Sequence, residues 1–160
     1  MAVDMFLKID DVKGESQDSK HKDEIDVIDW SWEMDTSATT QAGGGGGSGK
    51  VNVENLTVTK WVDKSSPNLM LATCSGKHYK EALLTVRKAG EKPLEYIKVT
   101  MKKVLVASVK TGAKGGQDRL TETITLNFGE FKVEYTPQKQ DGTGDAVVEA
   151  GWNIAGNAPL

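Results

Sequence analysis

The side chains best suited to catalysis or metal binding are two histidines, one cysteine and a short run of carboxylates. His21 and His78 lie in separate polar stretches without partners at the spacing of a zinc site, so we expect them to be solvated loop residues. Cys74 falls in a predicted helix, where a small core role is expected. The acidic run from Asp23 to Asp29 fits no calcium loop and is typical of a solvated face. The sequence therefore predicts no catalytic residues, no metal site and no enzyme activity.

One glycine-rich segment has the spacing of a phosphate-binding loop. Gly44 is followed by four residues and then by Gly49 and Lys50. A phosphate-binding loop also requires serine or threonine directly after the lysine, and a helix to follow. Here Val51 takes that position and begins an alternating, strand-like segment. Residues 42–50 are instead predicted to form a flexible loop, and no nucleotide or other cofactor is expected.

The overall composition is that of one soluble domain spanning residues 1–160. Its 20 Lys+Arg against 23 Asp+Glu give a formal net charge of -3, which is unlike a nucleic-acid-binding protein. No apolar run reaches the roughly 18 residues that a membrane-spanning helix needs. The N-terminus lacks the basic and apolar regions of a secretory signal, and the single cysteine favours folding in a reducing cytosol. We therefore expect neither nucleic-acid binding nor membrane insertion.

The dominant hydrophobic period is two residues, which indicates β-strands. Residues 3–9 alternate, except that Phe6 lies on the polar face. Residues 25–33 change phase midway, so a bulge is expected near Val27 and Ile28. Gly129 lies where the phase of a long segment changes, and this predicts a barrel corner. The remaining predicted strands are 51–61, with a phase change near Glu54 and Asn55, 82–87, 94–107, 121–136 and 147–154.

One helix is predicted beside these strands. Residues Ser65-Ser66-Pro67-Asn68 predict a serine N-cap followed by proline at the first helical position, and Gly76 can serve as the left-handed stop, so the helix covers about residues 66–75. A helix this short is marginal alone and must pack on the sheet. With seven or more strands and several corners, the predicted fold class is mainly β, a small closed or nearly closed β-barrel with one flanking α-helix.

Two tryptophans share one face of the strand at 25–33. Trp30 and Trp32 alternate with Asp29 and Ser31, so Ser31 faces outwards if the tryptophans are core residues. The alternative interpretation is a stand-alone carbohydrate-binding β-barrel that uses exposed tryptophans: Trp30, Trp32 or Trp61. The residues by themselves thus favour a binding function over catalysis.

Seven strings distributed along the chain carry a family resemblance. They are MAVDMFLKIDDVKGES at 1–16, DKSSPNLM at 63–70, GKHY at 76–79, LTVRKAG at 84–90, LEYIKVTMKKVLV at 94–106, YTPQKQDG at 135–142 and AGW at 150–152. Together they resemble the haemolysin-coregulated protein (Hcp) family, the tube-forming component of the bacterial type VI secretion system. The strings run in order from end to end, so the resemblance covers essentially the whole chain.

The resemblance implies a small two-sheet β-barrel with a structural role. Members of the family form homohexameric rings that stack into a hollow tube, which a spike protein caps and a contractile sheath surrounds. The ring lumen carries and protects small effector proteins on their way into target cells. The resemblance also implies that the protein leaves the bacterial cytoplasm through the type VI system without a cleavable signal peptide.

Two sets of site residues follow when the resemblance is combined with the strand pattern. A tube wall that must release its cargo should be lined by small or polar groups, so Ser31 and Asp29 are predicted to contact the effector in the lumen. The glycine-rich loop is predicted to contact the next ring, because a segment that orders on docking gives weak and reversible stacking. Its residues are Gly43, Gly44, Gly45, Gly46, Gly47, Ser48 and Gly49.

Overall fold

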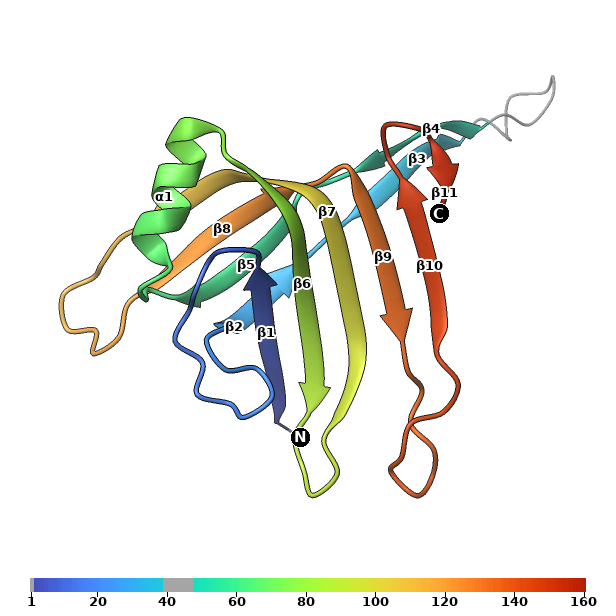
Figure 1. Ribbon diagram of the computed structural model, residues 1–160, viewed down its shortest axis with the longest axis horizontal. Helices are drawn as coiled ribbons and strands as arrows, with labels where there is room; N and C mark the ends of the chain where they lie inside the picture. Colours follow the sequence, from blue (N-terminus) through green and yellow to red (C-terminus); the bar gives the residue numbers. More distant parts are fainter. Residues whose placement is uncertain (1, 39–47) are drawn as a thin grey trace.

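The computed structural model describes residues 2–38 and 48–160 as antiparallel strands with one short helix, α1 (Ser66–Ser75). The strands are β1 (Val3–Ile9), β2 (Ile25–Ser31), β3 (Met34–Ala38), β4 (Ser48–Val53), β5 (Leu56–Trp61), β6 (His78–Lys88), β7 (Leu94–Thr111), β8 (Thr121–Asn127), β9 (Glu130–Tyr135), β10 (Val148–Asn153) and β11 (Ala158–Pro159). Figure 1 shows α1 at one end of the long axis and the β3–β4 pair projecting towards the other. Within the described residues, no helix is long and apolar enough to cross a membrane.

Six strands close into a barrel, which confirms the predicted fold class. The order in the large sheet is β11-β10-β9-β7-β6-β1-β2-β5-β8, and β8 also pairs with β7, so the sheet returns on itself. Strands β9, β10 and β11 extend outwards from β7, while β3 and β4 form a separate two-stranded sheet (Figure 1). The closed part therefore runs from β7 through β6, β1, β2 and β5 to β8.

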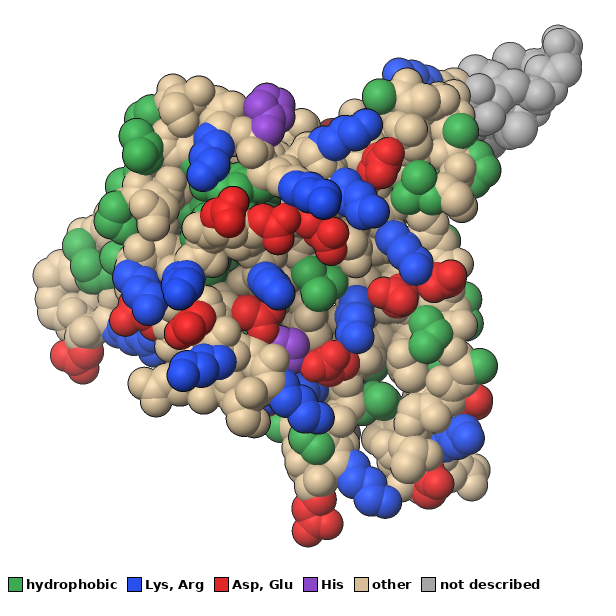
Figure 2. Space-filling view, viewed as in Figure 1, with side chains coloured by type: hydrophobic (Ala, Val, Ile, Leu, Met, Phe, Trp, Pro, Cys, Tyr) green, Lys and Arg blue, Asp and Glu red, His purple; other side chains and the backbone are tan. Residues whose placement is uncertain are grey.

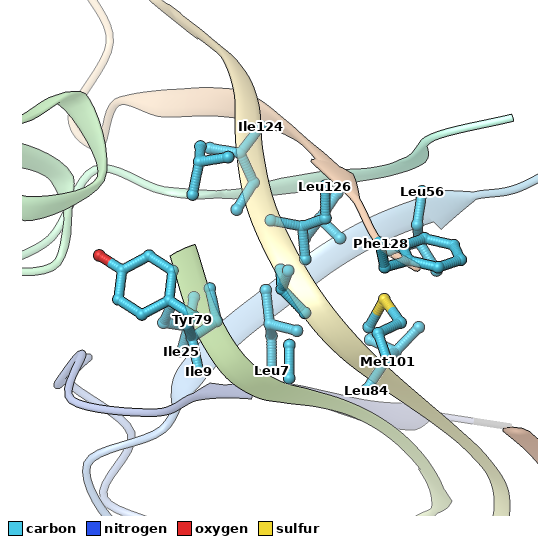
Figure 3. Packing of buried hydrophobic residues seen from close by; sticks show 14 of the residues in the cluster. Leu7, Ile9, Ile25, Leu56, Tyr79, Leu84, Met101, Ile124, Leu126 and Phe128 are labelled. Carbon is cyan, nitrogen blue, oxygen red and sulfur yellow. The ribbon is translucent and has the colours of Figure 1, made fainter. Parts of the chain in front are cut away.

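The barrel is filled by apolar side chains from alternating strand positions. Leu7, Leu84 and Ile124 have no exposed surface, and Figure 3 shows them within the packed cluster. Burial of each such side chain contributes roughly 1.5–3 kcal/mol. The core thus lies inside the barrel, and the outer faces of the strands are left to carry function.

The phase changes in the sequence mark bulges and corners. The register of β2 against β5 shifts between Val27 and Asp29, which confirms the predicted bulge. Gly129 separates β8 from β9, and both strands pair with β7, so the predicted strand 121–136 is two strands joined by a corner. At this corner Lys103 of β7 has a φ of 58°, and a Cβ on Gly129 would lie 3.1 Å from the Lys103 side chain. A side chain at position 129 would therefore require the Lys103 side chain to shift by a few tenths of an ångström.

The predicted strand 51–61 is likewise divided. β4 ends at Val53 and β5 begins at Leu56. β4 begins at Ser48, inside the segment predicted to be a loop, and it pairs with β3, which the sequence does not predict. The predicted stacking residues 43–47 lie outside the described residues. Of that set, only Ser48 and Gly49 are placed, as the first residues of β4.

Helix α1 covers the predicted residues but begins differently. Ser65 makes no side-chain cap hydrogen bond, and Pro67 is the second helical residue, not the first. Asp63 organises the start instead, because its Oδ1 accepts a hydrogen bond of 2.9 Å from the Ser65 N–H. The Asp63 N–H in turn donates to Ser66 Oγ over 3.0 Å. Asp63 therefore orders the turn that leads into the helix, although no side chain caps the first helical N–H groups.

The far end of α1 corrects one prediction and confirms another. Gly76 ends the helix with a φ of 68°, as expected for a left-handed stop. Cys74 is exposed, so its prediction as a core residue is wrong. Leu69 and Ala72 occupy the buried face, and Cys74 lies off that face.

A buried ion pair holds the start of α1 on the barrel. Lys60 of β5 is 0% exposed and Glu122 of β8 is 2% exposed, and the Lys60 Nζ bonds to Glu122 Oε1. The Ser66 hydroxyl donates to the same carboxylate over 2.5 Å, and Asp63 Oδ1 lies 3.2 Å from Lys60 Nζ. Both charges are desolvated, so removing either partner alone leaves the other charge buried without compensation.

The loop between β1 and β2 folds over the outer face of β1. His21 in this loop is 8% exposed, with Nδ1 bonded to Glu24 and Nε2 2.7 Å from Oε1 of Glu95 in β7. The expectation that His21 is a solvated loop residue is therefore wrong. Its second partner comes from 74 residues along the chain, where no local spacing could indicate it.

Candidate functional site

Ser31 and Asp29 lie on the outer face of the barrel, as the sequence predicts. Both side chains are exposed, whereas Trp30 and Trp32 are half-buried and pack against the core. Trp32 is fixed by a hydrogen bond of 2.9 Å from its Nε1 to the carbonyl oxygen of Glu54. The predicted alternation is confirmed, and the role of Ser31 and Asp29 in cargo contact stays a prediction.

Ser31 belongs to a row of hydroxyl side chains that crosses four strands. It lies opposite Thr57 of β5, Thr57 lies opposite Thr125 of β8, and Thr125 lies opposite Ser108 of β7. The hydroxyl oxygens of Ser108 and Thr125 are 2.7 Å apart. Residues that pair directly across antiparallel strands share one face of the sheet. The row therefore forms a continuous polar strip on the outside of the barrel.

A second row runs beside the first. Asp29 lies opposite Thr59, Thr59 opposite Thr123, and Thr123 opposite Lys110. This row carries two threonine hydroxyls in its centre and one charge at each end. The two rows together define what we call the hydroxyl face, formed by Asp29, Ser31, Thr57, Thr59, Ser108, Lys110, Thr123 and Thr125.

The hydroxyl face follows from a regular alternation in two strands. In β5 the residues Leu56 and Val58 point into the barrel, so Thr57 and Thr59 point out. In β8 the inward positions are Glu122, Ile124 and Leu126, and threonines alternate with them. Threonine suits an exposed strand position, because it is β-branched and carries a compact polar group. The predicted site omits these threonines, although their recurrence at every second position was a visible signal.

One end of the hydroxyl face opens into a hollow of about 460 Å³. Its lining is largely polar and consists of Ser31, Trp32, Glu33, Glu54, Asn55, Thr57 and Thr125. Glu33 and Glu54 bring two carboxylates to its rim, and Asn55 accepts a hydrogen bond of 3.0 Å from Asn127. This arrangement can bind a polar partner through hydrogen bonds, but it offers no extended apolar surface.

The face over β6, β7 and β9 differs in character. Figure 2 shows acidic and basic side chains interspersed there. In register, Lys102 of β7 lies opposite Glu81 of β6 on one side and Glu130 of β9 on the other. Alternating charges of this kind neutralise one another locally, and they do not create the single-sign field that nucleic acids require.

The remaining candidate chemistries find little support in this geometry. None of the four tryptophans is exposed, and the Arg119 guanidinium covers the ring of Trp61 at 4.2 Å, so the proposed sugar-stacking platform is contradicted. In residues 2–38 and 48–160, no group of three or more His, Cys, Asp or Glu side chains is arranged to hold a metal ion. The hydroxyl face is therefore the candidate functional site.

The fold defines a small β-barrel protein whose candidate site lies on its outer surface. Residues 6–135 match the family model described as type VI secretion system effector, Hcp. Protein hcp1 of Pseudomonas aeruginosa is 60% identical over 159 residues, which cover 98% of this chain and 98% of that protein. The chain therefore belongs to the Hcp family of type VI secretion proteins.

Solved structures agree with this assignment. A structure described as a type six secretion system protein superposes with a TM-score of 0.94 at 33% identity, covering 99% of this chain and 100% of that one. Hcp1 from Salmonella typhimurium gives a TM-score of 0.83 at 40% identity, covering 100% of both chains. The similarity thus includes the whole barrel and the strands that extend from it.

Proposed function

We propose that the protein is a non-catalytic structural subunit of the type VI secretion inner tube, a homohexameric ring that carries effector proteins in its lumen. The observation that carries this proposal is the hydroxyl face, whose two rows stop at β2 and β7 without a further strand beyond either end in the described residues. At the level of these rows, the pairing of β1 with β2 and of β6 with β7 has ended, so one edge of β2 and one edge of β7 are open to a second copy. Identical copies joined head to tail form a ring when the rotation between neighbours closes.

The dimensions of such a ring suit protein cargo. With about 4.8 Å between strands, four strands in each row and six copies, the perimeter is about 115 Å and the lumen about 37 Å across between backbones. A folded domain of about 100 residues has a radius of gyration of about 13 Å. A small effector can therefore fit inside the ring, with room for a layer of side chains or water.

The chemistry of the hydroxyl face suits transient binding. Short hydroxyl side chains bind polar groups directly or through water, and without an apolar patch they do not hold cargo permanently. Ser31 and Asp29 are proposed to contact the effector, and the hollow beside Ser31 gives this contact its shape. Replacing Ser31 by a bulky glutamine should reduce effector co-purification while rings persist, and undiminished recovery would refute the contact.

Stacking is proposed to involve the predicted loop Gly43–Gly49, whose last two residues begin β4. We call the β3–β4 pair the β3–β4 arm. The arm itself projects away from the barrel (Figure 1), which makes it available to a neighbouring ring. Deleting the five glycines at 43–47 should abolish tube growth without dissociating rings, and normal tubes would exclude this role. The spike protein and the contractile sheath are the further partners proposed, with export through the type VI system.

Negative-stain electron microscopy of the purified protein tests the central proposal. Six-fold rings with an open centre are expected. Uniform small particles without a hole would overturn the ring and remove the lumen from the mechanism.

A further inference from the structure

The second row of the hydroxyl face ends in two charges of opposite sign. Asp29 of β2 pairs with Thr59 alone, because the pairing of β1 with β2 stops at Asp26. At the other end, Lys110 of β7 pairs with Thr123 alone, because β6 has already left β7. Helix α1 contacts β7 but leaves Lys110 exposed. The row thus presents a carboxylate at one open end and an ammonium group at the other.

Neither of these charges has an ionic partner within the described part of the chain. Among residues 2–38 and 48–160, no cationic nitrogen lies within 4.0 Å of the Asp29 carboxylate, and no carboxylate lies within that distance of Lys110 Nζ. Some other strand charges do form ion pairs, as with Lys132 Nζ and Glu149 Oε2 at 3.1 Å. An isolated edge charge commonly serves to prevent unwanted strand pairing. Preventing strand pairing does not require that the two charges have opposite signs, nor that they lie at the two ends of one row.

We infer that Asp29 of one copy and Lys110 of the next form an ion pair where their rows meet. The partner is a second copy of this chain, and the inference rests on the proposed ring. Joining the rows head to tail brings the β2 end of one copy beside the β7 end of the next, about 4.8 Å apart between backbones. Opposite charges at directly facing strand positions attract.

The bulge residue beside Asp29 places an exposed apolar side chain near the same junction. Ile28 has no residue opposite it in β5, and its side chain is 36% exposed next to the open end of the row. Burial of this side chain would stabilise the junction, and the charge pair would fix which strand positions of the two copies face each other. The ion pair thereby selects the β7 end of a neighbour over other exposed edges.

Charge reversal tests this pairing. Asp29→Lys and Lys110→Asp each place like charges at every junction, and each should raise the concentration at which rings half-dissociate at least about tenfold. The measurement is mass photometry across a dilution series at low ionic strength. An equimolar mixture of the two variants should recover rings, because strict alternation puts opposite charges at every junction. Native mass spectrometry should then find equal numbers of the two variants in each ring.

A matched control separates this effect from net charge. Lys80→Asp reverses an exposed lysine of β6 and should leave ring stability at the wild-type value. Unchanged rings in both single variants, or no recovery on mixing, would overturn the ion pair while leaving the ring in place. A wild-type protein that forms no rings would instead overturn the proposed function, and the inference with it.

Discussion

The imidazole of His21 lies flat against the ring of Phe6, with centroids 4.3 Å apart and planes inclined by 10°. Phe6 is the apolar residue on the outer face of β1, and the stacked histidine covers it, leaving it 4% exposed. On the same phenyl ring, the Arg87 guanidinium lies 5.1 Å from the centroid. The loop between β1 and β2 is thus held on the barrel by one aromatic ring and the polar groups around it.

His21→Phe should keep the stack but lose both hydrogen bonds. Glu24 and Glu95 would then lose their imidazole partner, and for the buried Glu24 carboxylate an unsatisfied polar group costs roughly 1–3 kcal/mol. The free energy of unfolding in urea should fall by about this amount. His78→Phe, at an exposed histidine of β6, is the control and should change stability by less than about 0.5 kcal/mol. Equal losses in the two variants would show that the carboxylate contacts of His21 contribute nothing.

The same loop should make the free energy of unfolding depend on pH, through Asp18. Arg87 donates two hydrogen bonds to Asp18, of 2.5 and 3.1 Å, and these bonds hold the pKa of Asp18 well below its usual value. A carboxyl whose pKa is lowered on folding stabilises the protein above its unfolded pKa, and this contribution is lost as the pH falls towards the folded value. Asp18→Asn should therefore be less stable than wild type at neutral pH.

The difference between wild type and Asp18→Asn should be constant above about pH 5 and shrink below about pH 4. Urea unfolding at several pH values measures it, with Asp118→Asn at an exposed position as the comparison. A difference that does not change with pH would mean that the Asp18 carboxylate is not coupled to Arg87 in the way described.

How far the sequence predicts this fold depends on whether the signal is local. The alternation at residues 3–9 records which side chains of β1 enter the barrel, and the alternation of Trp30 and Trp32 with Ser31 does the same for β2, so β1 and the outward direction of Ser31 are both predictable. Pairing between strands that are far apart in the sequence leaves no such local pattern. Nothing near residues 121–136 indicates that β8 and β9 share β7 as a partner, so the sequence predicts a corner at Gly129 within one strand and not two separate strands.

The candidate site shows the same division. Each threonine of β5 and β8 is visible as an alternating polar residue, but the row that joins Ser31 to Ser108 exists only through the registers of three strand pairs. Likewise, the burial of Lys60 follows from a carboxylate 62 residues away. The roles of such residues can be identified only when the pairing of the barrel strands is known.

Lys60→Met should be among the most destabilising single changes in the protein. It removes the cation from a fully buried pair and leaves the Glu122 carboxylate desolvated, which costs about 3–5 kcal/mol. The double variant Lys60→Met with Glu122→Gln should recover much of this loss, since the neutral amide can still accept the Ser66 hydroxyl hydrogen bond. Thermal or urea unfolding of the two variants makes the comparison. A double variant no more stable than the single one would show that lost packing, and not the unpaired charge, dominates.

Larger side chains on the hydroxyl face should weaken effector binding most where they lie beside Ser31. Thr57→Gln and Thr125→Gln alter its neighbours in the same row, and each should weaken effector binding about tenfold, equivalent to about 1.4 kcal/mol. Thr121→Gln lies on the same face but outside that row, so its effect should be smaller. Thr100→Gln, on the charged face over β7 and β9, is the control and should leave binding unchanged. The readout is the amount of effector that co-purifies with intact rings, and a loss of equal size in all four variants would mean that the row around Ser31 has no special part in cargo contact.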